Sequence, residues 1–446
     1  MMTNISPRIS VRVLLWAAAP LIVFLVLLLT LERVNGSDEV PAPAVVPAET
    51  EGANPAAEND PAAMVASLES AVEQDPANAE TRALLGDAFY QQYRETADPS
   101  LLQRAQQAVD SAIEIDPANV TAVIDQGTLA LTKHDFSAGL EYGLRAHRLS
   151  PALVRPYNLI ADAQIELGRY NAAGKTLQRF VDLKPSLAAY SRVSYFRELH
   201  GDIDGATQAM KAAVSTGGGG EPLAYVQTLL GNLEFNQGRL GAAELQYRQA
   251  LVSDPTGYIQ AAAGLAQVDA ARGSFDAAIR RYRQVVDRLP LPQYAIALAD
   301  TELAAGEDAA AKRDLGVVQV EEKLFRSAGV NVDTELAIFE ADHGQAVQAV
   351  RLGAHAWRQA PSVRSADAYS WALNSAGRSD AALAMSRRAM RLGSRDPLFL
   401  YHAGQIARSA GKTERARRLL GRLVEQTPDF SPLYGPRAER ALAGLQ

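Results

Sequence analysis

The sequence predicts an all-α fold, a superhelical solenoid of about ten helix-turn-helix repeats that is preceded by one transmembrane helix. Three observations predict this fold. Prolines that end apolar helical patterns recur through residues 76–428, glycines recur between them at a nearly constant step, and a long uncharged apolar segment lies near the N-terminus. Because each repeat buries its apolar face only against its neighbours, we expect an elongated, curved rod rather than separate domains.

Residues 13–31 are predicted to form a transmembrane helix or an uncleaved signal anchor. The segment has nineteen residues and no charged side chain. As a helix it spans about 28 Å, which is close to the thickness of a hydrocarbon core. Because Arg8 and Arg12 precede it, residues 1–12 are expected in the cytoplasm and the bulk of the chain on the outer, periplasmic or extracellular side. The predicted location is the cytoplasmic membrane, crossed once.

A cleavable secretory signal, cut after Gly36, is the alternative for this segment, although its apolar run is longer than such signals usually have. Residues 32–62 are predicted to be a disordered linker rich in Pro, Ala and Glu. Ser37–Ala62 contains five prolines and six acidic residues, but no basic or aromatic residue. Such a composition cannot bury enough apolar surface to fold, so we expect a spacer between the membrane and the repeats.

Residues 63–428 are predicted to be the repeat array, because two kinds of helix-ending residue alternate through them. The glycines, separated by 33 to 38 residues, are Gly168, Gly201, Gly238, Gly273, Gly306, Gly344, Gly377 and Gly411. A glycine can adopt the left-handed conformation that ends the first helix of a repeat. A proline ends the second helix, because the residue before it is excluded from the helical region, and it also suits the opening turn of the following helix.

The repeated unit resembles the tetratricopeptide repeat, a 34-residue helix-turn-helix. The clearest copy carries Leu230-Gly231, Gly238, Ala243, Tyr247, Ala250 and Pro255. Ten copies are expected to start near residues 77, 120, 154, 187, 224, 259, 292, 330, 363 and 397. Met64–Gln74 is expected to be an isolated second helix that begins the stack. Residues 429–446 are expected to hold a terminal capping helix.

The sequence offers no pattern of catalytic or metal-binding residues. It has no cysteine, which excludes thiolate metal sites and cysteine nucleophiles. Glu340 and His343 have the E-x-x-H spacing of di-iron bundles, but such a site needs two of these motifs and two further inward-facing glutamates, and the sequence has only one motif. We therefore expect a protein that is not an enzyme and that uses no cofactor or metal.

Charge is distributed unevenly along the chain. Residues 37–80 contain ten acidic and no basic residues, whereas residues 377–422 contain eleven basic and three acidic ones. The basic region is interpreted first as a solvated outer face. The alternative is a contact with an acidic partner or with anionic lipid headgroups. A nucleic-acid partner is not expected, because the predicted topology places this region outside the cytoplasm.

The resemblance implies a binding groove, because in tetratricopeptide proteins the first helix of each repeat lines the concave face and binds peptides there. Amides offer both a donor and an acceptor to a peptide backbone, and aromatic side chains serve as anchors. The alternative is that these residues only pack the solenoid. The candidate groove residues are Asn158, Asp162, Tyr195, Asn232, Asn236, Gln260, Gln267, Asp300, Asp367, Trp371, Asn374, Tyr401, Gln405 and Arg408.

These observations favour a non-catalytic, membrane-anchored scaffold that mediates protein-protein interactions in a bacterial cell envelope. Its expected partners are a protein or peptide in the concave groove and the membrane through residues 13–31. Two alternatives stay open. One is a secreted, soluble binder of a glycan or small ligand, and the other is an accessory subunit of an envelope enzyme complex.

Overall fold

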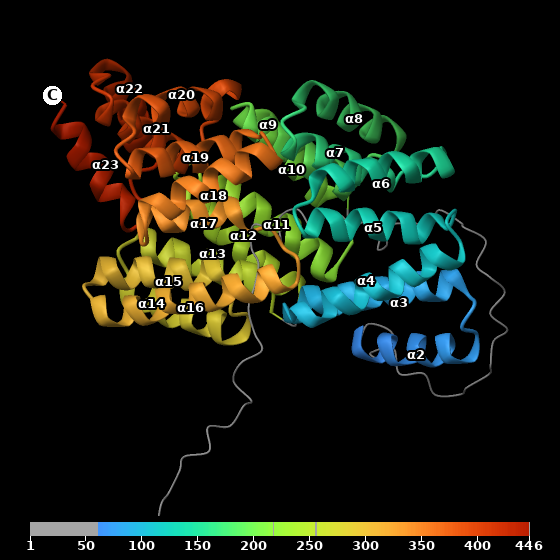
Figure 1. Ribbon diagram of the computed structural model, residues 1–446. Coiled ribbons are helices and arrows are strands. Elements are labelled where there is room, and N and C mark those ends of the chain that lie inside the picture. Colours follow the sequence, from blue (N-terminus) through green and yellow to red (C-terminus); the bar gives the residue numbers. More distant parts are fainter. Residues whose placement is uncertain (1–60, 217, 255–256, 446) are drawn as a thin grey trace, which may run out of the picture.

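The computed structural model describes residues 61–216, 218–254 and 257–445. This part of the chain contains 22 α-helices and one short 3-10 helix but no β-strand, which confirms the predicted all-α fold. One unpaired helix stands at each end of the array, α2 (Pro61–Gln74) and α23 (Tyr434–Ala443). Figure 1 shows these two helices at opposite ends of the molecule.

The other twenty helices form ten consecutive pairs, each joined by a short turn. The first helices of the pairs are α3 (Ala79–Thr96), α5 (Val120–Thr132), α7 (Pro156–Glu166), α9 (Leu187–Leu199), α11 (Gly220–Phe235), α13 (Ile259–Ala271), α15 (Pro292–Ala305), α17 (Asp333–Asp342), α19 (Val363–Ser375) and α21 (Pro397–Ser409). The second helices are α4 (Pro99–Ile115), α6 (Phe136–Leu149), α8 (Tyr170–Leu183), α10 (Ile203–Ser215), α12 (Leu240–Ser253), α14 (Phe275–Arg288), α16 (Asp308–Ser327), α18 (Ala346–Gln359), α20 (Ser379–Ala389) and α22 (Thr413–Gln426). Helix α20 continues into the 3-10 helix η2 (Met390–Leu392). The predicted helical-repeat solenoid is thereby confirmed.

Seven of the eight predicted glycines adopt the expected left-handed conformation in the turns inside the pairs. The backbone φ angle lies between 67° and 83° at Gly168, Gly201, Gly238, Gly273, Gly306, Gly377 and Gly411. Gly344 is not among the residues with positive φ, and there the Oε2 of Glu340 accepts a hydrogen bond of 2.7 Å from the Gln345 amide. In the second pair His134 takes the left-handed conformation, with a φ of 59°.

The prolines after the second helices act differently from the prediction at several junctions. Pro76 and Pro117 lie in the turn between helices, and the next helix begins only three residues later. The N-caps of α3 and α5 are Asn78 and Asn119, whose side chains accept the amides of Thr81 and Ala122 at 3.0 and 2.8 Å. An asparagine side chain satisfies an unpaired amide of the first turn, which proline cannot do.

Successive turns of the superhelix touch one another, which the expectation of an elongated rod did not include. The amide of Val363 donates to the hydroxyl oxygen of Tyr170 at 2.8 Å, although 193 residues separate them. The amide of Asn331 donates to the carbonyl of Lys133 at 3.1 Å. In Figure 1 the orange and red helices α19 and α20 lie beside the green helices α9 and α10. We call this contact between turns the seam.

The seam explains why some of the turn glycines are needed. A Cβ atom on Gly168 would overlap the carbonyl oxygen of Pro361, and one on Gly201 would overlap that of Gly393. By contrast, a Cβ atom on Gly377 or Gly411, which belong to the later superhelical turn, would meet nothing within 4 Å. The glycines of the earlier turn therefore serve both the left-handed conformation and the close approach of the later turn.

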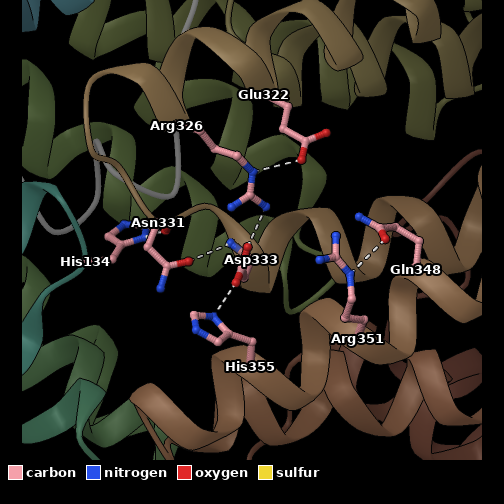
Figure 2. Close-up of polar contacts among 8 residues, drawn as sticks. All are labelled: His134, Glu322, Arg326, Asn331, Asp333, Gln348, Arg351 and His355. Carbon is pink, nitrogen blue, oxygen red and sulfur yellow. Dashed lines mark hydrogen bonds and ion pairs between the residues drawn. The ribbon is translucent and has the colours of Figure 1, made fainter.

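At one end of the seam an ion pair and a hydrogen bond of Asp333 hold the loop before α17 in place. Figure 2 shows Asp333 between Arg326 and His355. Its carboxylate lies 2.6 Å from Nη2 of Arg326 and 2.5 Å from Nδ1 of His355. The Asn331 carbonyl thereby faces His134, whose Nδ1 lies 2.5 Å from it. Because Asp333 fixes this loop locally, the Asn331 carbonyl can contact His134, which lies 197 residues earlier in the chain.

The described helices contradict the predicted single-pass location in the cytoplasmic membrane, and that prediction is wrong. Between Pro61 and Leu445, apart from the three undescribed positions, no helix is both long enough and apolar enough to cross a bilayer. The two described helices with 18 or more residues, α3 and α16, carry charged side chains along their length. The predicted cytoplasmic end (1–12), membrane helix (13–31) and nearly all of the linker (32–60) lie outside the described residues.

Candidate functional site

Three hollows of the described structure contain candidate groove residues from the first helices. The tyrosine–glutamine cavity measures about 250 Å³ and is formed by α11, α13 and α15 with parts of neighbouring segments. The seam cavity is the smallest, about 50 Å³, and lies between the two superhelical turns. The arginine cavity measures about 620 Å³ and is formed by α17, α19, α21 and α23.

The tyrosine–glutamine cavity has a wall of phenols and amides and no charged side chain. It is lined by Tyr225, Thr228, Leu229, Asn232, Tyr258, Gln260, Ala263, Gly264, Gln267, Tyr282, Gln293, Tyr294 and Ala297. Burial raises the pKa of Tyr258 well above its usual range, so its hydroxyl stays protonated. The cavity therefore presents neutral hydrogen-bonding groups beside aromatic surface.

Several polar atoms in this wall are buried without a hydrogen-bond partner among the described residues. They are both polar atoms of the Gln293 side chain, Nε2 and Oε1, and the hydroxyl of Tyr258. Only 5% of the Tyr258 residue surface is exposed. A buried polar group without a partner costs roughly 1–3 kcal/mol. The cavity wall thus contains a donor and an acceptor that the described part of the fold leaves without partners.

Asn232 is held in this wall by Tyr247. The hydroxyl of Tyr247 donates to Oδ1 of Asn232 at 2.8 Å. The Tyr247 ring is fully buried between two glycines, Gly231 and Gly264, and a Cβ atom on either would lie 2.5 Å from a ring carbon. These two glycines therefore make room for a tyrosine that orients a cavity amide.

The seam cavity is filled largely by its own polar contacts. The hydroxyl of Tyr195 donates to Oε1 of Glu166 at 3.3 Å, and Arg364 of the later turn lies close to both residues. Burial raises the pKa of Glu166, against the opposing effect of the Arg364 guanidinium. These contacts tie α7 and α9 to α19, so we assign this cavity to the seam.

The arginine cavity combines an aromatic floor with a basic rim. Its lining residues are Ala341, Asp342, Trp371, Asn374, Ser375, Tyr401, Gln405, Arg408, Ser409, Arg437, Arg440 and Ala441. The Trp371 indole donates to the Asp342 carboxylate at 2.8 Å, and its ring lies 5.7 Å from that of Tyr401. Behind it, the buried His402 stacks on Trp371 at 4.3 Å.

Nine of the fourteen candidate groove residues line one of these hollows. Asn232, Gln260 and Gln267 line the tyrosine–glutamine cavity. The arginine cavity receives Trp371, Asn374, Tyr401, Gln405 and Arg408, whereas Tyr195 lies in the seam cavity. Two of these positions differ from the expected anchors, because Trp371 and Tyr401 are 9% and 3% exposed and form a floor rather than projecting side chains. Their role in binding stays a prediction.

The other five candidates lie outside the three hollows. Asp162 is taken by a buried ion pair, since Nη2 of Arg192 lies 3.0 Å from its carboxylate. Asp367 lies 2.7 Å from His402, and Asp300 lies 3.1 Å from His343. Asn236 donates to Glu198 at 3.3 Å, and Asn158 is 2% exposed. Most of these polar side chains therefore face partners from neighbouring repeats instead of the solenoid interior.

Several wall residues that the structure brings together were not predicted from the sequence. In the tyrosine–glutamine cavity they include Gln293 and three tyrosines, Tyr225, Tyr258 and Tyr294. These tyrosines follow one another by 33 and 36 residues, close to the repeat length, and that recurrence was the available signal. In the arginine cavity Arg437 and Arg440 were missed because they lie on the capping helix, outside the repeat pattern.

The basic 377–422 region covers the second helices α20 and α22. Arg387, Arg388, Arg418 and Arg422 are exposed. Burial and the nearby guanidinium groups of Arg387 and Arg418 lower the pKa of Arg415, so like charges gather there. The exposure agrees with a solvated outer face, and the acidic or lipid partner stays a prediction. Glu340 and His343 do not converge on a common site, because Glu340 holds a turn and His343 faces Asp300.

Comparison with known proteins identifies one repeat. The sequence model of the tetratricopeptide repeat matches residues 154–187, which contain α7 and α8. No curated protein matches the chain. Together with the observed helix pairs, this match shows an all-α, tetratricopeptide-like repeat solenoid. Such an architecture is typical of protein-protein interaction scaffolds.

Solved structures similar to the chain include repeat proteins of several kinds. TTC0263, a thermophilic TPR protein of Thermus thermophilus, has 19% identity and a TM-score of 0.36, over 40% of this chain and 92% of that one. YrrB, a TPR protein with an unusual peptide-binding site, has 18% identity and a TM-score of 0.28, over 44% and 96%. A monomeric IFIT1 mutant solved with Gppp-AAAA has 16% identity and a TM-score of 0.40, over 80% and 75%.

Proposed function

We propose that this protein is a non-catalytic interaction scaffold that holds an extended, uncharged peptide segment of a partner protein in the tyrosine–glutamine cavity. The observation that supports this proposal is the set of buried polar atoms without partners on Gln293 and Tyr258. A peptide unit has one N–H donor and one C=O acceptor, which complement the Oε1 and Nε2 of a glutamine.

The character of the cavity wall supports an uncharged ligand. No ionisable carboxylate or cationic side chain lines the cavity, and its ionisable groups are four tyrosines. A charged peptide side chain would lose its hydration there without gaining a counter-charge, which is costly. Apolar side chains of the peptide would instead contact the phenol rings, which bury large apolar areas at binding sites.

Selection of peptides from a display library on the full-length protein tests the proposal. A selected peptide should bind about tenfold more weakly to Gln293→Ala and to Tyr258→Phe. Gln178→Ala is the matched control, because Gln178 is exposed on α8 and donates to Asp182 at 2.9 Å, outside the cavity wall. Fluorescence anisotropy with the selected peptide measures these affinities.

Stability measurements separate binding from a structural role. Because the Gln293 amide has no partner in the described structure, Gln293→Ala should keep or raise the urea midpoint of the unliganded protein. A lower midpoint would show that the amide serves folding. Selection of neutral glycans but no peptides, with the same dependence on Gln293, would replace the peptide by a carbohydrate and contradict the proposal.

A further inference from the structure

The arginine cavity has a different chemistry from the tyrosine–glutamine cavity, although both lie on the same row of first helices. Helix α15 of the tyrosine–glutamine cavity is followed by α17 of the arginine cavity, and Asp300 and His343 join these helices at 3.1 Å. A bound peptide that leaves the tyrosine–glutamine cavity from α15 toward α17 therefore reaches the arginine cavity. The arginine cavity is also more than twice as large.

Three arginines on the rim of this cavity are without a carboxylate partner in the described part of the chain. Arg408 donates to the neutral Gln405 at 3.0 Å, Arg437 lies 5.6 Å above the Tyr434 ring, and neither they nor Arg440 form an ion pair. By contrast, the buried Arg192 is paired with Asp162 at 3.0 Å. A guanidinium presents a fork of donors that matches a carboxylate.

The one carboxylate in the cavity wall does not neutralise this rim. Asp342 accepts the Trp371 indole N–H at 2.8 Å and also bonds the Tyr434 hydroxyl. Burial raises the pKa of Asp342, and both of these hydrogen bonds oppose that effect. The lining residues thus carry three arginines against one engaged acid, and the cavity is electropositive. In addition, Oδ1 of Asn374 is buried there without a hydrogen-bond partner among the described residues.

We propose that the arginine cavity binds an acidic peptide segment, whose carboxylates pair with Arg408, Arg437 and Arg440 above the Trp371–Tyr401 floor. This inference rests on the proposed function, because it takes the ligand to be a further part of the same peptide chain. The Oδ1 of Asn374 accepts a peptide N–H, and the aromatic floor contacts the aliphatic parts of the acidic side chains. The scaffold then recognises a neutral segment followed by an acidic one.

Anisotropy with two labelled peptides and the full-length protein tests this inference. The first peptide alternates glutamate and alanine, and the second carries glutamine at each glutamate. We expect the acidic peptide to bind at least about tenfold more tightly. The triple variant Arg408→Gln, Arg437→Gln and Arg440→Gln should lose this preference. The matched control, Arg387→Gln, Arg418→Gln and Arg422→Gln on the outer face, removes the same charge and should keep it.

Three outcomes would overturn the inference. In the first, the two peptides bind equally well. In the second, both triple variants lower the affinity for the acidic peptide to the same extent, which would show that binding depends only on the net charge of the protein. In the third, single-stranded RNA binds and needs Arg408, Arg437 and Arg440, while the acidic peptide does not bind. Circular dichroism checks that each variant is folded. If the neutral peptide selected earlier still depends on Gln293, the failure concerns the arginine cavity alone and not the proposed function.

Discussion

The hydroxyl oxygen of Tyr170 accepts a 2.8 Å hydrogen bond from the backbone amide of Val363, and this bond joins the start of α8 to the start of α19. Val363 is the first residue of its helix, where an amide has no partner within the helix. The guanidinium of Arg391 lies 5.2 Å above the Tyr170 ring. Tyr170 is therefore a capping residue supplied by another superhelical turn.

The seam predicts that substitution by alanine lowers the stability of the folded protein to different extents at two glycines with the same backbone conformation. Gly168 and Gly411 both have a φ of 67°, but only at Gly168 would a Cβ atom overlap the neighbouring turn, at the Pro361 carbonyl. Gly411→Ala should cost about 1 kcal/mol for the left-handed conformation alone. Gly168→Ala should cost a further 1–3 kcal/mol or so, as overpacked sites do. Urea unfolding followed by circular dichroism measures both, and equal costs would mean that the turns separate in solution.

His134 offers a second test of the seam. It holds a left-handed backbone at a φ of 59°, and its Nδ1 donates to the Asn331 carbonyl at 2.5 Å. His134→Ala and His134→Gly both lose this hydrogen bond, but only glycine relieves the backbone strain. We therefore expect the alanine variant to be less stable than the glycine variant by about 1 kcal/mol. If the two variants unfold at the same urea concentration, the strain is absent.

The packing of Tyr247 predicts a link between a helix crossing and the tyrosine–glutamine cavity. Gly264→Ala would place a methyl group 2.5 Å from the Tyr247 ring, which orients Asn232. We expect a loss of about 1–3 kcal/mol in stability and weaker peptide binding. Gly316→Ala on the exposed face of α16 is the control, because its Cβ meets nothing within 4 Å. That variant should gain roughly 0.5–1 kcal/mol, and a gain at Gly264 as well would contradict the tight crossing.

Glu321 predicts how stability depends on pH. Its side chain is 1% exposed, neither carboxyl oxygen has a partner among the described residues, and burial raises its pKa to about 9 from 4.5. Between these two values the unfolded chain releases the proton while the folded chain retains it, so stability falls as the pH rises. From pH 5 to pH 8 the wild type should lose about 2–4 kcal/mol more than Glu321→Gln does.

Unfolding in urea at the two pH values measures this difference. Glu439→Gln, at an exposed position on α23, is the control and should keep the wild-type dependence on pH. If Glu321→Gln shows the same loss of stability as the wild type, Glu321 is ionised in the folded protein and has found water or a counter-charge.

The candidate site was predictable to the extent that it follows the helix repeat. Asn232, Gln260 and Gln267 occupy inward positions of first helices, and the structure places all three in one cavity wall. Asp162 has an equally suitable position, yet Arg192 of the next repeat pairs with it. Gln293 was overlooked because it stands in the first turn of its helix, directly after Pro292. The position of a residue in its repeat predicts the direction in which its side chain faces. It does not predict whether a residue of a neighbouring repeat already pairs with that side chain.

The helices, their pairing and most of their ends follow from the amino-acid sequence alone, because apolar spacing and left-handed glycines act within a few residues. The seam, in which Tyr170 meets Val363 and His134 meets Asn331, does not follow from it. Those contacts depend on the sum of small rotations between successive repeats, and a small change in each rotation would separate the turns. It is therefore the packing of one superhelical turn on the next, and not the sequence pattern, that decides which polar groups are paired across the seam.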